Sequence, residues 1–556
     1  MPANERLGGA LRELAARGFV DRGMVKGWRL YKGSLTLSVG DLPILFFIKD
    51  WNFFDYPEIQ VVDGLQKFPR LRPHLNNDGG LCYFAPKSVV LDRYDPATAI
   101  AQCLEQAQSV LEKVLKDEAY RLGDLQIEFL VHWGKEDPQP IRVYMGSSTR
   151  GVQSASINFL AKDSGRVAVI ADTSEDAKVL AKAMALGELL PSQNRCWIFR
   201  CTHLPPVPAQ FPRTVSQLFE WLREWDMKMY NEIQHLLGQT KAYGFKMLPM
   251  AIHSPVGWIG FMFGVDGAMK GARNPSEYKQ HLHDHGNTFE IHRLSFADVS
   301  PEFVHSRNLS FRDLSGKRIT LVGCGAIGSH LAAALVRLGA GSGGGLLRLL
   351  DNDTLGPENL GRHYLGYDSL SQPKASKLRS DLLRQFPLAS IEAVNADVVD
   401  CPSLFAADLV IDATGEEAVS EYLNETWLRG DGKVPVLYVW IKGNGECVQC
   451  LWTDKEKLAC FRCLKEVNPA VHRQDRFPVL KRPPAGKVLG CHSFTPYAVS
   501  APLHATALAV DTICDWLKKG DPSPRFRTRK SENADLFLVE NHNPQRLAGC
   551  PACLTS

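Results

Sequence analysis

The sequence lacks several features that mark membrane, secreted and fibrous proteins. No run reaches the roughly 18 apolar residues that a membrane-spanning helix needs. The amino-terminal residues hold no apolar segment between a basic region and a cleavage site. The 14 cysteines are too few, for 556 residues, to form a disulfide scaffold. These absences speak against a membrane protein or a small secreted module, and they predict a cytoplasmic protein with reduced thiols.

A surplus of one charge is also missing. The 64 Lys and Arg residues nearly balance the 61 Asp and Glu residues, which leaves a net charge of +3. No basic run provides the stripe of cations that follows a phosphate backbone, so nucleic acid is not the expected partner. The hydrophobic content of 45% is typical of globular chains. At about 150 residues per domain, the length predicts three or four domains.

Residues 1–135 predict an α+β domain. The first residues carry leucines at helical spacing. Strand-like runs follow over 28–39, 42–48 and 58–62. A loop rich in proline, asparagine and glycine then carries Cys82, and Asp95 and Pro96 provide the cap and first turn of a long helix.

Residues 136–310 predict a mixed α/β domain without a clear chemical motif. Strand-like segments alternate with one helical stretch over 219–237. His281, His283 and His285 could suggest a metal site, but we favour a solvated loop for these histidines.

Residues 311–556 predict a mostly parallel sheet with crossover helices. The motif Gly323-x-Gly325-x-x-Gly328 directly follows an apolar strand and opens a helix. Its glycines allow a tight turn and let phosphate approach the amides at a helix N-terminus. Asp351 ends the next strand, where its carboxylate can accept a hydrogen bond from a ribose hydroxyl. These features suit a dinucleotide or ATP equally, so an NAD oxidoreductase stays open.

The residues that follow resemble the ThiF and ubiquitin-activating (E1) adenylation family. Asp351 is followed eight positions later by Asn359, three further on by Arg362, and then by Lys374 in a Pro-Lys-Ala-Ser turn. The resemblance implies that Arg362 and Lys374 bind the phosphates of ATP, while Asn359 orients them or assists Mg²⁺. Such cations are needed because adenylation brings a carboxylate against the α-phosphorus of ATP.

The sequence departs from this family at the expected Mg²⁺ ligand. Many members carry Asp-Cys-Thr-Asp after the fourth strand, with the second aspartate on the metal, whereas this chain reads Asp-Ala-Thr-Gly-Glu. Carboxylates are the side chains that Mg²⁺ prefers. Asp412 is therefore our first candidate and Glu416 our second.

Two cysteine pairs have the spacing of a zinc knuckle. They are Cys460 with Cys463, and Cys550 with Cys553. Four thiolates suit tetrahedral Zn²⁺ with no open position, which predicts a structural site. The same two pairs recur in the resembled family. Cys447 and Cys450 have the same spacing but lie in a strand-like run, where positions i and i+3 face opposite sides, so we expect them only to pack.

Cys491 is the candidate nucleophile of this half of the chain. It follows a stretch rich in proline, lysine and arginine, and Lys487 and His492 nearby favour its thiolate. In the resembled family a loop at this place carries the cysteine that attacks the acyl-adenylate. The resemblance therefore implies that Cys491 forms a thioester, with an inert loop cysteine as the alternative.

Residues 73–83, Pro-His-Leu-Asn-Asn-Asp-Gly-Gly-Leu-Cys-Tyr, resemble the active-site loop of ubiquitin-conjugating (E2) enzymes. The resemblance implies that Cys82 accepts the acyl group by transthioesterification. Asn76 would stabilise the oxyanion while a lysine amine attacks. A leucine replaces the usual proline and the loop is shorter, so Asn77 stays open for this role. We interpret His74 as a residue that organises the loop rather than as a general base.

The complete order resembles the fused conjugating enzymes of bacterial type II CBASS anti-phage systems. It predicts a multidomain chain with an E2-like α+β domain (1–135), an α/β linker domain like an inactive adenylation domain (136–310) and a Rossmann-like ThiF/E1 α/β domain with a zinc knuckle (311–556). ATP, Mg²⁺ and Zn²⁺ are the implied cofactors. The implied acyl donor is the C-terminus of a cGAS-like nucleotidyltransferase, or alternatively of a bacterial ubiquitin-like protein.

Two further expectations come from the same resemblance. Activating domains of this kind are usually homodimers in which a partner arginine reaches the nucleotide, and Arg307 is a candidate for that arginine. A sulfur-carrier adenylyltransferase of the ThiF or MoeB type is the alternative function. It would use the same ATP site without any need for Cys82.

Overall fold

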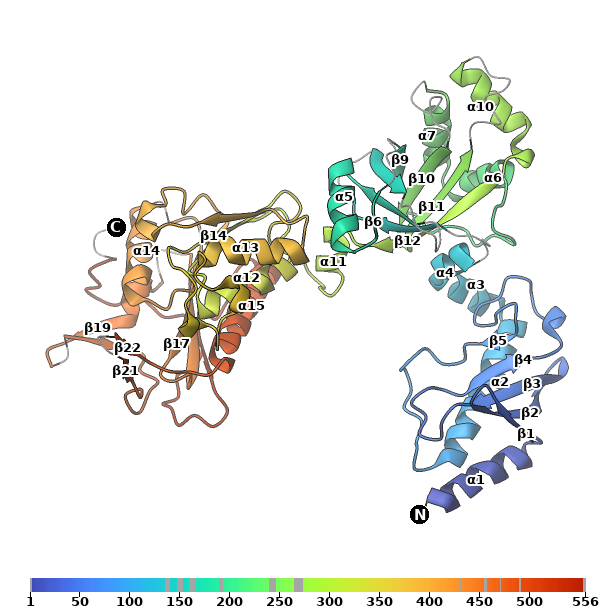
Figure 1. The fold of residues 1–556 in the computed structure, drawn as a ribbon, viewed down its shortest axis with the longest axis horizontal. Helices are drawn as coiled ribbons and strands as arrows, with labels where there is room; N and C mark the ends of the chain where they lie inside the picture. Colours follow the sequence, from blue (N-terminus) through green and yellow to red (C-terminus); the bar gives the residue numbers. More distant parts are fainter. Residues whose placement is uncertain are drawn as a thin grey trace. The chain divides into compact units, whose positions relative to one another are not determined.

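The fold is that of a computed structural model (Figure 1). It describes residues 3–135, 141–147, 154–159, 167–189, 194–239, 247–264, 274–430, 432–454, 458–470, 472–489 and 492–553. The chain divides into two compact units. The first comprises Met1–Val143, Ser164–Val167 and Asn194–Phe296, and the second comprises Tyr144–Asp163, Ala168–Gln193 and Ala297–Ser556. None of the helices in the described ranges is long and apolar enough to cross a membrane.

The first unit begins with an antiparallel sheet of five strands in chain order. Its elements are α1 (Ala3–Ala16), β1 (Val20–Val25), β2 (Trp28–Leu37), β3 (Gly40–Ile48), β4 (Glu58–Val61), the short helix η1 (Leu65–Lys67), β5 (Gly80–Leu81), α2 (Pro96–Lys116) and α3 (Glu118–Ile127). Ile100 and Leu104 of α2 are buried together with Phe46 of β3. The Asp95 side chain accepts a hydrogen bond from Thr98 N and caps α2. The predicted α+β domain is confirmed.

The rest of the first unit has its own core. Its elements include α4 (Phe129–Lys135), β9 (Asn194–Arg200), α6 (Val215–Trp225), α7 (Met227–Leu237), β10 (Met247–Ser254), β11 (Gly257–Gly264), α10 (Pro275–Asp284), η2 (Gly286–Thr288) and β12 (Ile291–Asp298); β6 (Ile141–Met145) precedes β9. Strand β9 runs parallel to β10, and β10, β11 and β12 are antiparallel neighbours. Phe129 and Trp133 of α4 lie in the core of these strands and helices.

Two expectations for this region were wrong in detail. The helical stretch over 219–237 is two helices, because Asp226 ends α6 and accepts a hydrogen bond from Met229 N at the start of α7. The histidines are on and next to helix α10 rather than in a loop. His283 and His285 are exposed, as the solvated interpretation predicted, and His283 Nε2 lies 2.8 Å from Gln234 Oε1.

Helix α4 provides a test of the middle core. Trp133 is 1% exposed and donates from Nε1 to Gly260 O at 3.0 Å. Replacing Trp133 with alanine is expected to reduce the free energy of unfolding of this region by about 3–5 kcal/mol, because a cavity forms and a buried carbonyl loses its donor. Ile127→Ala is the control, since Ile127 is 82% exposed. Urea unfolding followed by tryptophan fluorescence and circular dichroism would measure both, and equal stabilities would contradict this role of α4.

The second unit is built around a sheet of seven strands in the order β15-β14-β13-β16-β17-β18-β23. Its elements are β13 (Arg318–Val322), α12 (Ala326–Arg337), β14 (Leu346–Leu350), α13 (Lys374–Gln385), β15 (Ile391–Val394), β16 (Leu409–Asp412), α14 (Glu417–Arg429), β17 (Val436–Lys442), β18 (Cys447–Thr453), α15 (Ser500–Lys519) and β23 (Phe526–Lys530). The first five strands of that order are parallel to one another. Strand β18 is antiparallel to β17, and β23 is antiparallel to β18. The predicted mostly parallel sheet is confirmed.

Both faces of this sheet are buried by helices. On β16, Leu409 and Ile411 belong to the core shared with α12, α13 and α15, whereas Val410 belongs to the core shared with α14. Successive side chains of a strand face opposite sides. A strand that is covered on both sides therefore reads as a continuous apolar run, which is the pattern that the sequence shows here.

Shorter elements complete the second unit. They are β7 (Ser154–Phe159), β8 (Val167–Ala171), α5 (Ser174–Ala183), α11 (Pro301–Ser306), η3 (Pro357–Asn359), η4 (Tyr367–Ser369), η5 (Val398–Asp400), η6 (Phe461–Leu464), β19 (Lys465–Asn468), β20 (His472–Asp475), β21 (Lys487–Leu489) and β22 (His492–Phe494). Strand β19 pairs antiparallel with β20, and β21 pairs antiparallel with β22. Cys447 and Cys450 are buried in β18, as their spacing in a strand predicted.

Candidate functional site

The glycine motif lies in the turn between β13 and α12, where the strand order of the sheet reverses. Gly323 has a φ of 85°, and a Cβ there would lie 2.8 Å from Thr414 Cγ2. A Cβ on Gly328 would lie only 1.8 Å from Gly323 O, whereas a Cβ on Gly325 would have no atom within 4 Å. Two glycines therefore permit close packing, and the middle one leaves room in front of the helix N-terminus, where anions bind.

Asp351 is oriented toward this turn by two backbone amides. Its Oδ2 accepts from Cys324 N at 2.6 Å and its Oδ1 from Asp353 N at 2.8 Å. Lys374, at the start of α13, is buried and forms an ion pair with Asp353. Although burial opposes the shift, this ion pair holds the pKa of Asp353 below its usual value. Asp353 thus links Lys374 to Asp351, which contacts the glycine turn. The sequence analysis did not identify Asp353, although it lies two positions after Asp351.

Asn359 and Arg362 lie on the segment between β14 and α13. The Asn359 Oδ1 accepts from Gly356 N at 3.0 Å, and the Arg362 guanidinium lies 5.2 Å from the ring of Tyr497. His363 was not predicted and is 7% exposed; its Nε2 lies 2.7 Å from Cys324 O. Burial lowers the pKa of His363 to about 4, so this histidine is neutral and ties the segment to the glycine turn.

Asp412, at the end of β16, is buried at 1% exposure. Its carboxylate accepts hydrogen bonds from Thr414 N, Thr414 Oγ1 and Ser420 Oγ. Burial raises the pKa of Asp412 above its usual value. Glu416, the second candidate for a metal ligand, is exposed at the start of α14. Asp412 therefore fixes the loop that packs on Gly323, and Glu416 is the carboxylate that solvent reaches.

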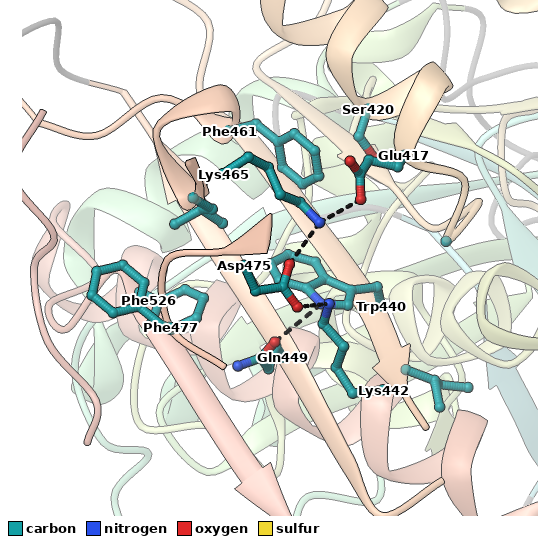
Figure 2. Close-up of a pocket in the computed structure, with 13 residues that line it drawn as sticks. Glu417, Ser420, Trp440, Lys442, Gln449, Phe461, Lys465, Asp475, Phe477 and Phe526 are labelled. Carbon is teal, nitrogen blue, oxygen red and sulfur yellow. Dashed lines mark hydrogen bonds and ion pairs between the residues drawn. The ribbon is translucent and has the colours of Figure 1, made fainter. Parts of the chain in front are cut away.

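A pocket of about 120 Å³ begins beside this loop. Figure 2 shows aromatic side chains and a chain of alternating charges around it. Lys442 Nζ lies 2.6 Å from Asp475 Oδ2, Lys465 Nζ lies 2.6 Å from Asp475 Oδ1, and Lys465 also pairs with Glu417. Trp440 is among the aromatic residues of the lining. Because each lysine has a carboxylate partner, the pocket suits an uncharged group rather than an anion.

The four knuckle cysteines meet in one cluster. Their Sγ atoms lie 3.7 Å (Cys460–Cys463), 3.9 Å (Cys460–Cys550), 3.5 Å (Cys463–Cys553) and 3.4 Å (Cys460–Cys553) apart. A tetrahedron with Zn–S bonds of about 2.3 Å has S···S distances of about 3.8 Å. The four thiols therefore fit a Zn²⁺ ion.

Hydrogen bonds to the sulfurs support this fit. The hydrogen bond from Cys460 and that from Leu547 N hold the pKa of Cys463 below its usual value, against the effect of burial. Asn424 Nδ2 donates to Cys460 Sγ at 3.5 Å. Thiolate ligands need such donors. Asn424 was not predicted, because it comes from α14 and no spacing links it to the cysteines.

Residues 490 and 491, and with them Cys491, lie outside the described residues, whereas 472–489 and 492–553 are described. The Asn444 side chain donates to Ala485 O at 2.9 Å and to Pro496 O at 2.8 Å, and its Oδ1 accepts from Ala485 N at 2.8 Å. One asparagine thus holds both ends of the segment that contains Cys491. Tyr497, next along the chain, lies over Arg362, which places the end of this segment beside the candidate phosphate-binding residues.

Cys82 is exposed directly after β5. The loop before it is closed by hydrogen bonds from Asn76 N to Gly80 O at 2.9 Å and from Gly79 N to Asn76 O at 3.1 Å. The Asn76 amide nitrogen lies 3.3 Å from the position that a Cβ on Gly80 would take, so this side chain packs over the strand that leads to Cys82. Asn77 is exposed on the same loop.

His74 adds a group of charges next to this loop. Its Nε2 lies 2.9 Å from Asp124 Oδ2 and its Nδ1 lies 3.3 Å from Glu128 Oε1. Cys82 N donates to His74 O at 2.8 Å. Sequence reasoning missed Asp124 and Glu128. Their spacing of four residues, which places two acids on one helical face, was the available signal.

The glycine turn gives a paired test. Gly328→Ala is expected to reduce the free energy of unfolding by on the order of 3 kcal/mol, because the new Cβ meets a backbone carbonyl that cannot move aside. Gly325→Ala should change stability by about 1 kcal/mol or less. It should nevertheless weaken ATP binding, since its Cβ enters the space in front of the helix N-terminus. Urea unfolding and calorimetric titration with ATP would measure both effects. Wild-type stability of Gly328→Ala would contradict the packing argument.

Comparisons with known proteins agree with the two modules. The ThiF family model matches residues 299–544 and the Prokaryotic E2 family B model matches residues 21–139. The chain is 31% identical over 540 residues to the "ATP-dependent ubiquitin transferase-like protein Cap2" of Pseudomonas aeruginosa (strain BWHPSA011 / Pa011), with 95% of each chain covered. It is 26% identical to the Vibrio cholerae protein of the same name, with 81% of each covered.

Among solved structures, the chain is similar to E. coli MccB with ATP, at a TM-score of 0.34 and 18% identity over 43% of this chain and 67% of that one. The identity to the Pseudomonas relative extends over almost the whole of both chains, which is sufficient to assign the family. The chain therefore belongs to the family of ATP-dependent ubiquitin transferase-like enzymes, in which an E2-like conjugating module and a ThiF/E1-like activating module are parts of one polypeptide.

Proposed function

We propose that the two modules carry one acyl group through four steps. A protein C-terminal carboxylate is adenylated at the glycine turn, captured as a thioester on Cys491, transferred to Cys82 and joined to a target amine. The observation that carries this proposal is the presence, in one chain, of an exposed cysteine on an E2-like loop and a glycine turn furnished with Asp351 and Lys374. Linkage makes the transfer between the two cysteines intramolecular, which raises its effective concentration.

The adenylation step uses the positive groups around the turn. A carboxylate oxygen attacks the α-phosphorus, the new O–P bond forms, and the bond to the β-phosphate breaks to release pyrophosphate. The N-terminus of α12 and the cations Lys374 and Arg362 bind the phosphates. Mg²⁺, when bound, neutralises charge on the phosphates that leave. The burial of Asp412 and its hydrogen bonds to Thr414 and Ser420 favour Glu416 as the metal ligand and Asp412 as the group that holds the loop.

The acyl donor in this proposal is the C-terminus of a cGAS-like nucleotidyltransferase, with a bacterial ubiquitin-like protein as the alternative. The pocket beside Gly415 supports a peptide tail, since its aromatic walls and paired charges suit an uncharged side chain near the reacting carboxylate. We place the protein in the cytoplasm as part of a CBASS anti-phage system.

The proposed organisation has three domains, over 1–135, 136–310 and 311–556, with α4 packed into the middle core. We further propose a homodimer through the adenylation domain. Arg307 is exposed at the end of α11, where its guanidinium lies 5.4 Å from its own Phe303 ring, and it is the candidate for a partner-supplied arginine.

The cysteine cluster in this proposal holds a structural Zn²⁺. Cys460 directly precedes η6 and Cys463 lies within it, and η6 also carries Phe461 of the pocket wall. Closing the cluster with Cys550 and Cys553 therefore holds that wall against the C-terminal segment. The ion would serve stability and not the chemical step, because four thiolates leave no open position.

The relay is tested with wild type, Cys491→Ala and Cys82→Ala, incubated with ATP, Mg²⁺ and the nucleotidyltransferase encoded beside the enzyme. Wild type should form a thioester adduct that thiol reductants cleave, together with conjugates that resist them. Cys491→Ala should form neither, and Cys82→Ala should stop at the Cys491 adduct. Reducing and non-reducing gels would separate these species.

A donor that lacks its last residue is the control for this experiment and should give no adduct. Activity of Cys82→Ala equal to wild type would favour the sulfur-carrier adenylyltransferase instead, because that function needs only the ATP site. Pyrophosphate release without any adduct would contradict the thioester steps.

Zinc is tested by metal analysis of purified protein. Wild type should hold about one zinc ion per chain, because four thiolates complete one coordination sphere. Cys553→Ser should lose the ion and unfold at a lower temperature. Cys514→Ser, a change on α15 away from the cluster, should keep both the ion and the unfolding temperature. Retention of zinc by Cys553→Ser would contradict the site.

A further inference from the structure

A cysteine, a histidine and an aspartate meet at the edge of the middle core, and none of them takes part in the proposed relay. Cys201 directly follows β9, and His203 lies two residues further along the same loop. Asp226 is the residue that joins α6 to α7. Each of the three offers one ligand atom, and these atoms all lie within 4.8 Å of one another. Three elements of the middle core thus bring a sulfur, an imidazole nitrogen and a carboxylate oxygen to one point.

The distances between these atoms agree with those around one Zn²⁺ ion. Asp226 Oδ2 lies 3.5 Å from Cys201 Sγ and 3.0 Å from His203 Nδ1. Zn–S bonds of about 2.3 Å, with Zn–N and Zn–O bonds of about 2.1 Å, give tetrahedral edges of about 3.6 Å for S···O and about 3.4 Å for N···O. A small opening of the cluster therefore admits the ion. Thiolate, imidazole and carboxylate are also the ligand types that Zn²⁺ takes in proteins.

Contacts outside the cluster fix the position of each ligand residue. Asp226 Oδ1 accepts from the backbone N–H at the start of α7 at 2.9 Å, which leaves Oδ2 to face the cysteine and the histidine. Trp225 Nε1 donates to His203 O at 3.0 Å, and Cys201 N donates to His253 O at 2.9 Å. Hydrogen bonds of this kind orient the ligands of metal sites. The cluster therefore has the outer support that a metal site needs.

The cluster is open to solvent on one side. The His203 side chain is 69% exposed and that of Asp226 is 15% exposed, whereas Cys201 is buried. In the part of the chain that the structure describes, the group comprises these three side chains. Three protein ligands with an accessible side leave a fourth position to water. This arrangement differs from the four-thiol cluster, where the protein supplies all the ligands.

We propose that Cys201, His203 and Asp226 form a second metal site, which takes Zn²⁺ with a water molecule as the fourth ligand. When the ion binds, the Zn–S bond forms and the Cys201 thiol releases its proton to solvent. The bound ion links the loop after β9 to the junction of α6 and α7. This inference goes beyond the proposed function, because no step of the acyl relay uses these residues.

Cobalt binding tests the site, because a thiolate bound to Co²⁺ gives a sulfur-to-metal charge-transfer band in the near ultraviolet. The full chain is washed with a chelator until metal analysis finds a constant content of about one zinc ion, that of the four-thiol cluster. It is then titrated with Co²⁺, which binds such ligands less tightly than Zn²⁺ and leaves the cluster zinc in place. Wild type should bind about one Co²⁺ per chain and show the charge-transfer band.

Three variants assign the ligands. Cys201→Ser should lose the charge-transfer band, because an oxygen replaces the sulfur. Asp226→Asn removes the charge but keeps a good cap for α7, and it should weaken Co²⁺ binding by at least about tenfold, as should His203→Ala. Cys514→Ser, a thiol change on α15, is the matched control and should keep both the band and the affinity. Circular dichroism checks that each variant is folded.

Thermal unfolding adds a readout that does not depend on the spectrum. Added Zn²⁺ should raise the unfolding temperature of wild type more than that of Asp226→Asn, because an ion that binds the folded state stabilises it. Equal increases would contradict the site. The proposal would also be overturned by a folded Cys201→Ser that retains the band, or by a wild-type chain that binds no Co²⁺. Neither measurement uses ATP or an acyl donor, so the outcome is independent of the relay experiment.

Discussion

The close approach of helix α12 to the turn that precedes it is the contact on which the activating module depends. Only a residue without a side chain fits at Gly328, because a Cβ there would lie 1.8 Å from the backbone oxygen of Gly323. This close approach brings the helix N-terminus up to the end of β13. Asp351 and His363 bind the amide and the carbonyl of Cys324 in the same turn. The segments after β14 and β16 are therefore fixed relative to the helix N-terminus, and the candidate phosphate-binding groups with them.

Satisfied polar groups extend this order to the rest of the module. The Asp412 carboxylate accepts hydrogen bonds from Thr414 and Ser420. The Asn444 side chain donates to a carbonyl on each side of Cys491. The thiol cluster includes Cys460, which caps η6, and Cys463, which lies in η6, and two other residues of η6 line the pocket beside the loop. Buried polar groups cost free energy unless they are paired. These pairings therefore limit the loops of the site to few conformations.

The conjugating module exposes its candidate cysteine instead of enclosing it. Cys82 is exposed, which suits the proposed transfer between two partners. His74 and its two carboxylates come from elements that are about 50 residues apart in the chain.

The sequence by itself determined the elements and the local motifs. Apolar periodicity predicted the strands and helices of both modules, the glycine spacing predicted the turn before α12, and two Cys-x-x-Cys pairs predicted the thiol cluster. These features are local, because one chain segment carries each pattern. The tertiary structure alone decided the partners: Asp353 for Lys374, Asn424 for Cys460, and Asp124 with Glu128 for His74. It also buried Asp412 and divided a single helical stretch at Asp226. Periodicity reports which face of an element is apolar, but not which distant side chain that element meets when the chain folds.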